Sequence, residues 1–183
     1  MNNNKLDTPQ TMVALVIMGV SGCGKSSAGQ AIAQQLGWEL VEGDSYHSQQ
    51  SVDKMAAGIA LNDEDRQGWL ERLSLRLSQA STSHSVVLTC SALKHKYREQ
   101  LRSAQPLGFV FLELNYETAL TRVQTRPGHF FSPELVANQF ATLEDPRLES
   151  DVLTISATTE LGEIARLVQQ WLSNQTPTSP IQK

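Results

Sequence analysis

An eight-residue loop near the amino end limits the possible folds more than any other part of the chain. Gly19–Ser26 reads GVSGCGKS and matches the pattern G-x-x-x-x-G-K-[ST] at every fixed position. An uninterrupted apolar run, Met12–Met18, precedes the loop, and a helical pattern over Ser26–Leu36 follows it. A buried strand, a glycine-rich turn and a helix in this order form the phosphate-binding loop, or P-loop. The motif therefore predicts a nucleotide site.

Each part of this loop has an expected task. Glycines bring backbone N–H groups close to an anion, and the positive end of the following helix adds to the attraction. Lys25 is expected to reach the β- and γ-phosphates, and the Ser26 hydroxyl is expected to ligate Mg²⁺. Cys23 occupies a free position, which we interpret as a small residue tolerated in the loop. The phosphate-binding backbone is assigned to Gly19, Val20, Ser21, Gly22, Cys23 and Gly24.

The rest of the chain alternates strand-like and helix-like segments. Strands are expected at Met12–Met18, Trp38–Val41, Val86–Cys90, Phe109–Leu114 and Val152–Ile155. Helices are expected at Ser26–Leu36, Arg66–Ala80, Lys94–Arg102, Tyr116–Arg126, from Ser132-Pro133 onward, and at Glu160–Leu172. This alternation predicts a three-layer α/β fold, a five-stranded parallel sheet with helices on both faces. Ligands of such sheets bind at the carboxyl ends of the strands.

Length and charge exclude several classes of protein. A chain of 183 residues fits one domain, expected at 12–172, with polar tails at 1–11 and 173–183 that should be poorly ordered. A net charge of −4 disfavours a basic nucleic-acid binder. No apolar run approaches the ~20 residues that span a bilayer, and no signal peptide is visible. Two cysteines outside any CxxC motif fit a reducing compartment, so the cytoplasm is expected.

Nucleotide binding leaves three classes open: a GTPase-type switch, a fragment of an ATPase motor, and a small-molecule kinase. The strand Val86–Cys90 does not end in the aspartate of an ordinary Walker B motif, and a motor normally needs a longer chain. We therefore favour a small kinase that uses ATP and Mg²⁺.

Candidate acceptor residues follow the second and third strands. A phosphoryl-transfer site needs a carboxylate that orients the attacking hydroxyl and another near Mg²⁺, often through water. Asp44 suits the first role and Glu42 the second, although both would also fit an ordinary acidic turn. Arg66 lies near a helix start, where a cation is unfavourable unless it binds an anion. Lys94 and Arg98 are open to either interpretation, an anion site or a solvated basic face.

A cluster of basic residues joins two helices late in the chain. Arg122, Arg126, Gly128 and His129 precede the helix start at Ser132. In a small kinase this position suits a mobile lid, about 122–133, that closes over the phosphates and excludes water. An exposed basic loop is the alternative.

Six segments together resemble one known family. They are MGVSGCGKS (18–26), EGDSYH (42–47), KMAAGIALNDEDRQGWL (54–70), CSALKHKYR (90–98), RPGHFF (126–131) and QFATLEDP (139–146). In this order they resemble the gluconate kinases, or gluconokinases, among the P-loop small-molecule kinases. The segment GVSGCGKS marks a broad group of kinases, whereas LNDEDRQGWL, CSALKHKYR and GHFF are more specific.

The resemblance implies ATP-dependent phosphorylation of D-gluconate to 6-phospho-D-gluconate by a homodimer that needs Mg²⁺. It implies that Asp44 orients the 6-hydroxyl and that Lys25 and Arg126 act with it in catalysis. Arg122 and Arg126 would clamp the phosphates. The residues that would hold gluconate are His47, Arg66, Lys94, Arg98 and His129.

Three positions depart from the family pattern. Glu42 stands where aspartate is frequent, the neutral run Ser48–Ser51 stands where a proline and a basic or amide residue are frequent, and Gly68 replaces a frequent proline. The neutral run motivates one alternative, the same fold acting on another aldonate or on shikimate. A non-catalytic nucleotide-binding module is the other alternative.

Overall fold

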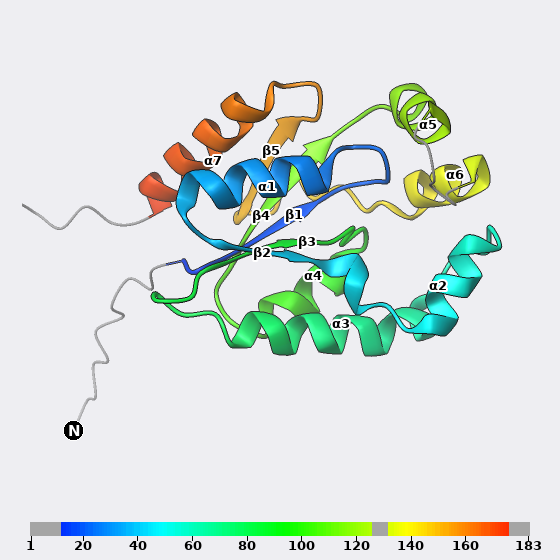
Figure 1. Ribbon diagram of the computed structural model, residues 1–183, viewed down its shortest axis with the longest axis horizontal. Helices are drawn as coiled ribbons and strands as arrows, with labels where there is room; N and C mark the ends of the chain where they lie inside the picture. Colours follow the sequence, from blue (N-terminus) through cyan, green and yellow to red (C-terminus); the bar gives the residue numbers. More distant parts are fainter. Residues whose placement is uncertain (1–11, 126–131, 176–183) are drawn as a thin grey trace, which may run out of the picture.

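The computed structural model describes residues 12–125 and 132–175, drawn in colour in Figure 1. Arg126 and His129 lie outside these residues, as do both predicted tails apart from 173–175 and half of the predicted lid, 126–131. None of the helices within the described ranges is long and apolar enough to cross a membrane.

Five parallel strands form a single sheet, as predicted. They are β1 (Ala14–Met18), β2 (Glu39–Glu42), β3 (Val86–Thr89), β4 (Gly108–Glu113) and β5 (Val152–Ser156). The order across the sheet is β2-β3-β1-β4-β5. In the central strand, Val16 pairs with Leu88 on one side and with Phe109 on the other. The carboxyl end of β3 therefore lies between those of β1 and β2.

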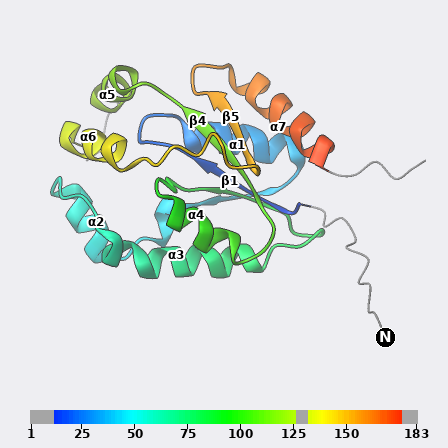
Figure 2. The same cartoon turned by 180° about the vertical axis from the view of Figure 1, so that it is seen from behind.

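Helices cover both faces of the sheet and gather at one end of it (Figures 1 and 2). They are α1 (Lys25–Leu36), α2 (Gln49–Ala56), α3 (Asp63–Ser78), α4 (His95–Arg102), α5 (Tyr116–Thr125), α6 (Pro133–Thr142) and α7 (Leu161–Gln175). One face carries α1 and α7, and the opposite face carries α3 and α4. The three-layer α/β prediction is confirmed.

Two elements were not predicted, and one runs further than expected. The 3₁₀ turn η1 (Gly43–Tyr46) and helix α2 lie in a segment for which no structure was assigned. Helix α7 continues to Gln175, past the expected domain boundary at 172. The predicted strands differ from the observed ones by one or two residues at their ends.

The core explains why β1 is apolar throughout. Leu15 and Ile17 pack into the cluster formed with α1 and α7, while Val16 and Met18 pack into the cluster formed with α3 and α4. All four side chains are fully buried. A strand buried on both faces has no solvent side, so it reads as a continuous apolar run rather than an alternating one.

Local signals in the sequence set the helix ends nearest the site. The Asn62 side chain accepts from the Asp65 N–H, and the Asp65 carboxylate accepts from the Asn62 N–H, forming a capping box at the start of α3. Ser132 caps α6, with Pro133 in its first turn. Helix α1 ends at Gly37, whose φ of 68° is left-handed.

Candidate active site

A cavity of about 640 Å³ opens at the carboxyl ends of β1, β2 and β3. The P-loop forms its floor, and η1, α2, α5 and α6 contribute walls. Among its lining residues are Lys25, Asp44, His47, Arg66 and Gln139. The topology therefore brings the predicted phosphate site and most of the predicted acceptor site into one space.

The P-loop is held from within and from α6. The Lys25 ammonium donates to the carbonyls of Gly19 at 3.1 Å and Val20 at 3.0 Å. The Ser21 N–H donates to the Gln139 side chain at 2.6 Å. Gly22 has a φ of 83°, and a Cβ there would lie 2.9 Å from the Ala119 carbonyl, so only glycine fits. Helix α6 thus helps to position the loop, a role that sequence reasoning did not assign to Gln139.

The expected magnesium ligands are in direct contact. Glu42 accepts from the Ser26 hydroxyl at 3.1 Å and from the Thr89 hydroxyl at 2.5 Å. These hydrogen bonds therefore orient Ser26 and Glu42 at the end of the P-loop. One hydroxyl and one carboxylate form a small set of hard oxygen ligands, and Mg²⁺ is commonly bound by such a set together with substrate phosphates and water. The residues present fit the ion.

Asp44 and His47 lie together at the turn η1. The Asp44 side chain is 86 % exposed, and its Oδ1 lies 3.9 Å from His47 Nε2. The His47 ring stacks on the Trp69 indole with centroids 4.4 Å apart. Burial, together with the nearby charges of Arg66 and Arg72, lowers the His47 pKa to about 4, although the Asp44 carboxylate raises it. His47 is therefore neutral at pH 7, and its buried Nδ1 has no hydrogen-bond partner among the described residues.

Arg66 is a buried cation that forms no ion pair with any described residue. It is only 8 % exposed, and no carboxylate of the described residues lies within ion-pair distance of it. Its guanidinium contacts aromatic faces instead, with Cζ 6.0 Å from the centroid of Trp69 and 5.8 Å from that of Tyr97. Burying an uncompensated charge is unfavourable, so this position favours an anion supplied by a ligand.

Lys94 is placed differently from the prediction. Its ammonium pairs with Asp63 at 2.8 Å and does not line the cavity. Asp63 also accepts from Lys96 at 2.5 Å and from the Tyr97 hydroxyl. Hydrogen bonds from Lys94, Lys96 and Tyr97 hold the Asp63 pKa far below its usual range. The structure therefore gives Lys94 a carboxylate of the chain itself as its partner.

Arg98, predicted to bind substrate, lies away from the cavity. Its side chain is 1 % exposed, does not reach the cavity, and forms an ion pair with Glu149 at 2.5 Å. The other donors of the guanidinium go to backbone carbonyls. Arg98 therefore has no N–H group left for a ligand.

Arg122 lines both the larger cavity and a second, smaller one of about 390 Å³. Its guanidinium donates to the carbonyls of Gly22 at 3.2 Å and Ala157 at 3.3 Å. The second cavity is also lined by Thr158 and Thr159, which follow β5. Sequence reasoning missed this segment, although the loop after a fifth parallel strand must reach the same edge of the sheet as the others.

Comparison with known proteins identifies the family of the chain. The shikimate kinase family model matches residues 21–171. Gluconokinase from Gluconobacter oxydans is 43% identical over 144 residues, covering 78% of this chain and 81% of that protein. Thermosensitive gluconokinase from Escherichia coli is 38% identical and covers 86% of each chain.

Solved structures show the same relationship. A gluconokinase from Sinorhizobium meliloti superposes with a TM-score of 0.81 at 40% identity, covering 91% of this chain and 95% of that one. Shikimate kinase from Aquifex aeolicus, at 15% identity and a TM-score of 0.62, shares the fold alone. By its sequence and its fold, the chain belongs to the gluconokinases, within the shikimate kinase family of P-loop kinases.

Proposed function

We propose that the chain transfers the γ-phosphoryl group of ATP to the 6-hydroxyl of D-gluconate, giving ADP and 6-phospho-D-gluconate. One observation supports this most: the buried Arg66, which forms no ion pair within the described residues, shares a cavity with the P-loop and with Asp44. An acceptor with a carboxylate at one end would supply the missing counter-charge. Its other end could then reach Asp44 beside the P-loop.

The geometry suggests how the two substrates divide the space. The phosphates of ATP would lie on the P-loop backbone and Lys25, between the two cavities. The larger cavity holds Asp44 and Arg66, so it suits the acceptor. The smaller one, lined by Arg122 and Thr158, suits the nucleoside. Ser26 and Glu42 would hold Mg²⁺, which when bound offsets the charge of the phosphates.

Asp44 is the group that we assign to the acceptor hydroxyl. Its carboxylate is exposed and makes no short hydrogen bond within the described residues, so it is free to accept one from the 6-hydroxyl. In the transfer, that oxygen bonds to the γ-phosphorus while the bond from phosphorus to the β–γ bridging oxygen breaks, and the hydroxyl proton passes to Asp44. Neutral His47 would add a hydrogen bond to the acceptor without repelling Arg66.

A substrate panel tests the proposal. The purified protein with Mg-ATP is assayed for ADP release against gluconate, other aldonates and shikimate. Turnover of gluconate with formation of 6-phosphogluconate is expected. Turnover of another acceptor in its place would refute the assignment of gluconate.

A second measurement separates catalysis from mere nucleotide binding. Asp44→Asn should lower kcat by at least ~100-fold while the Kd of Mg-ATP is preserved, because the carboxylate serves the acceptor. Asp53→Asn, an exposed carboxylate on α2 outside the cavity, is the matched control and should be unaffected. Equal activity of both variants would count against a catalytic role for Asp44.

Further assignments rest on the family resemblance. We propose that Arg126 contacts the phosphates and His129 the gluconate, from a lid at about 122–133. We also propose a cytoplasmic homodimer. Light scattering of the purified chain tests the dimer, and Arg126→Ala, with an expected loss of kcat, tests the lid.

A further inference from the structure

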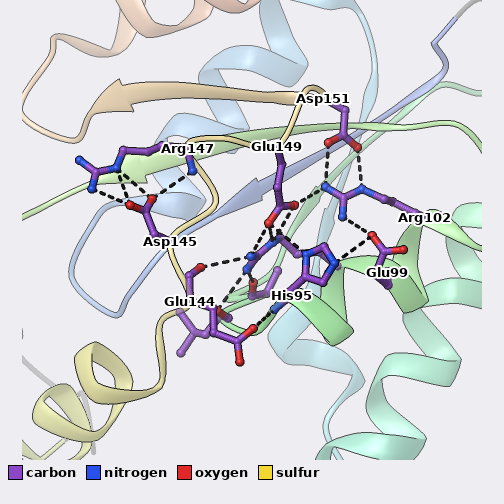
Figure 3. Close-up of polar contacts among 11 residues, drawn as sticks. His95, Glu99, Arg102, Glu144, Asp145, Arg147, Glu149 and Asp151 are labelled. Atoms are coloured by element: carbon purple, nitrogen blue, oxygen red, sulfur yellow. Dashed lines mark hydrogen bonds and ion pairs between the residues drawn. The ribbon is translucent and has the colours of Figure 1, made fainter.

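A partly buried ionic network joins the β3–α4 loop to the connection between α6 and β5 (Figure 3). Arg98, fully buried on α4, pairs with Glu149 through two of its nitrogens. Arg102 binds the other oxygen of Glu149 and also pairs with Asp151 at 2.7 Å. Burial would raise the Glu149 pKa, but hydrogen bonds from Arg98 and Arg102 outweigh it and lower the pKa to about 2. Glu149 is therefore ionised at any pH near neutrality.

The Arg98 guanidinium uses all its donors, and several serve backbone carbonyls. Nη1 donates to Ala92 O at 2.9 Å and to Leu93 O at 3.1 Å. Nη2 donates to Glu144 O at 3.1 Å as well as to Glu149. A guanidinium has five N–H donors in a fixed plane. This one therefore fixes two separate chain segments relative to each other.

The first segment, residues 91–93, follows β3 and lies between the P-loop and α4. Ser91 lines the cavity, and its carbonyl accepts from the Gly19 N–H of the P-loop at 3.4 Å. Ala92 follows with a φ of 44°, a left-handed conformation that is strained for a residue with a Cβ. Such strain persists only where the surroundings impose it. Here the Arg98 hydrogen bond to the Ala92 carbonyl contributes to imposing it.

The second segment begins where α6 ends. Glu144 donates its N–H to Leu93 O at 2.9 Å, and its carboxylate accepts from the His95 N–H at 2.6 Å, at the start of α4. One turn earlier, Gln139 holds the P-loop through Ser21. The two segments that Arg98 joins therefore both contact the P-loop, one from β3 and one from α6.

We propose that Arg98 is a positioning residue for phosphoryl transfer: by holding the Ala92, Leu93 and Glu144 carbonyls, it sets the separation between the phosphate loop and the acceptor wall of the cavity. This proposal rests on the proposed kinase function but not on the identity of the acceptor. Because Arg98 touches no substrate, its loss should impair the relative placement of the substrates rather than the binding of either one.

The test must separate positioning from stability, because Arg98→Met alone removes one of the two arginines that pair with the partly buried Glu149. The double variant R98M/E149M removes both charges, and Arg102 keeps Glu99 and Asp151 as partners, so its melting temperature should fall less than that of Arg98→Met alone. Its carbonyl contacts remain lost, and kcat should fall at least ~10-fold with KM for ATP within threefold, since a misplacement near 1 Å can cost ~100-fold. Recovery of kcat along with the melting temperature would overturn the proposal.

Arg102→Met is the matched control. Arg102 contacts the same Glu149 but otherwise bonds only to carboxylates, so it holds no backbone carbonyl of the loop. We expect a lower melting temperature with kcat within threefold of the wild type. A loss of kcat equal to that of R98M/E149M would also overturn the proposal, because it would make the effect one of general stability.

The wild type is assayed first, so that the two proposals fail separately. If it does not phosphorylate gluconate, the proposed function is refuted. The positioning role is then decided by hydrogen exchange of the Glu144 amide, which donates to Leu93 O. Faster exchange in R98M/E149M than in R102M supports the role, and equal exchange refutes it.

Discussion

Gly43 separates Glu42 from Asp44 and lies against the end of β3. A Cβ built on Gly43 would meet the Thr89 carbonyl oxygen at 2.1 Å, far inside the contact distance of the two atoms. The neighbour is backbone within the sheet, so it cannot rotate away. In Gly43→Ala the β2 end must therefore move by about 1 Å, and Asp44 moves with it.

Two effects of this substitution can be separated. Overpacking at a buried position should lower the free energy of unfolding by about 1–3 kcal/mol. Displacement of the carboxylate near the reacting hydroxyl should lower kcat by about 100-fold. Both are measurable on one preparation, by urea unfolding and by the ADP-release assay at a temperature where the variant is fully folded.

Gly37→Ala provides the control. Gly37 ends α1, has a φ of 68°, and a Cβ there would meet no atom within 4 Å. Its replacement should cost about 1–2 kcal/mol through backbone strain alone. Stability would then fall by a similar amount in both variants, while only Gly43→Ala loses activity. If Gly43→Ala keeps kcat within threefold of the wild type, the steric argument is refuted.

Three further predictions concern charge in the cavity. Lys25→Ala should lower kcat by at least ~100-fold with little change in melting temperature, because the ammonium serves phosphate charge rather than the core; unchanged kinetics would contradict our account of the loop. His47 binds a proton near pH 6.5 in the unfolded chain but only near pH 4 when folded, so its contribution to stability is present above pH 6.5 and is lost as the pH falls toward 4. That contribution is at most ~3 kcal/mol. The free energy of unfolding in urea should therefore differ less between pH 7.5 and pH 5 in His47→Gln than in the wild type. Arg66→Gln should raise the KM for gluconate about 10–100-fold. Lys94→Gln should raise it less, because Lys94 already pairs with Asp63. Initial rates at varied gluconate concentration show which variant has the higher KM.

The sequence predicted the elements that bury an apolar face and missed those that do not. The run at β1 and the stripe on α1 were clear because both pack into the core. Helix α2 exposes Val52 and turns Met55 to the cavity, so it has no stripe facing the core to detect. Its one local signal was the cap, in which the Ser48 hydroxyl accepts from the Ser51 N–H.

Basic residues at the carboxyl edge of the sheet were predicted as a group but have separate roles. Arg66 lines the cavity, Lys94 pairs with Asp63, and Arg98 binds Glu149, 51 residues away along the chain. Nothing local distinguishes these cations, because each lies near a helix start. Their roles depend on which carboxylates the tertiary structure brings close, and a single sequence does not show that pairing.

Strand β3 supplies neither the P-loop nor Asp44, yet its carboxyl end contacts both the P-loop and the residues that precede Asp44. The Thr89 hydroxyl donates to Glu42, and the Thr89 carbonyl limits the approach of Gly43. Two residues further, the Ser91 carbonyl accepts from Gly19 of the P-loop. The order β2-β3-β1 makes this arrangement unavoidable, since the central of three adjacent strands must touch both neighbours. We infer that β3 sets the distance between bound ATP and the acceptor. Substitutions at the carboxyl end of β3 should therefore lower kcat more than they raise the KM for ATP or for gluconate.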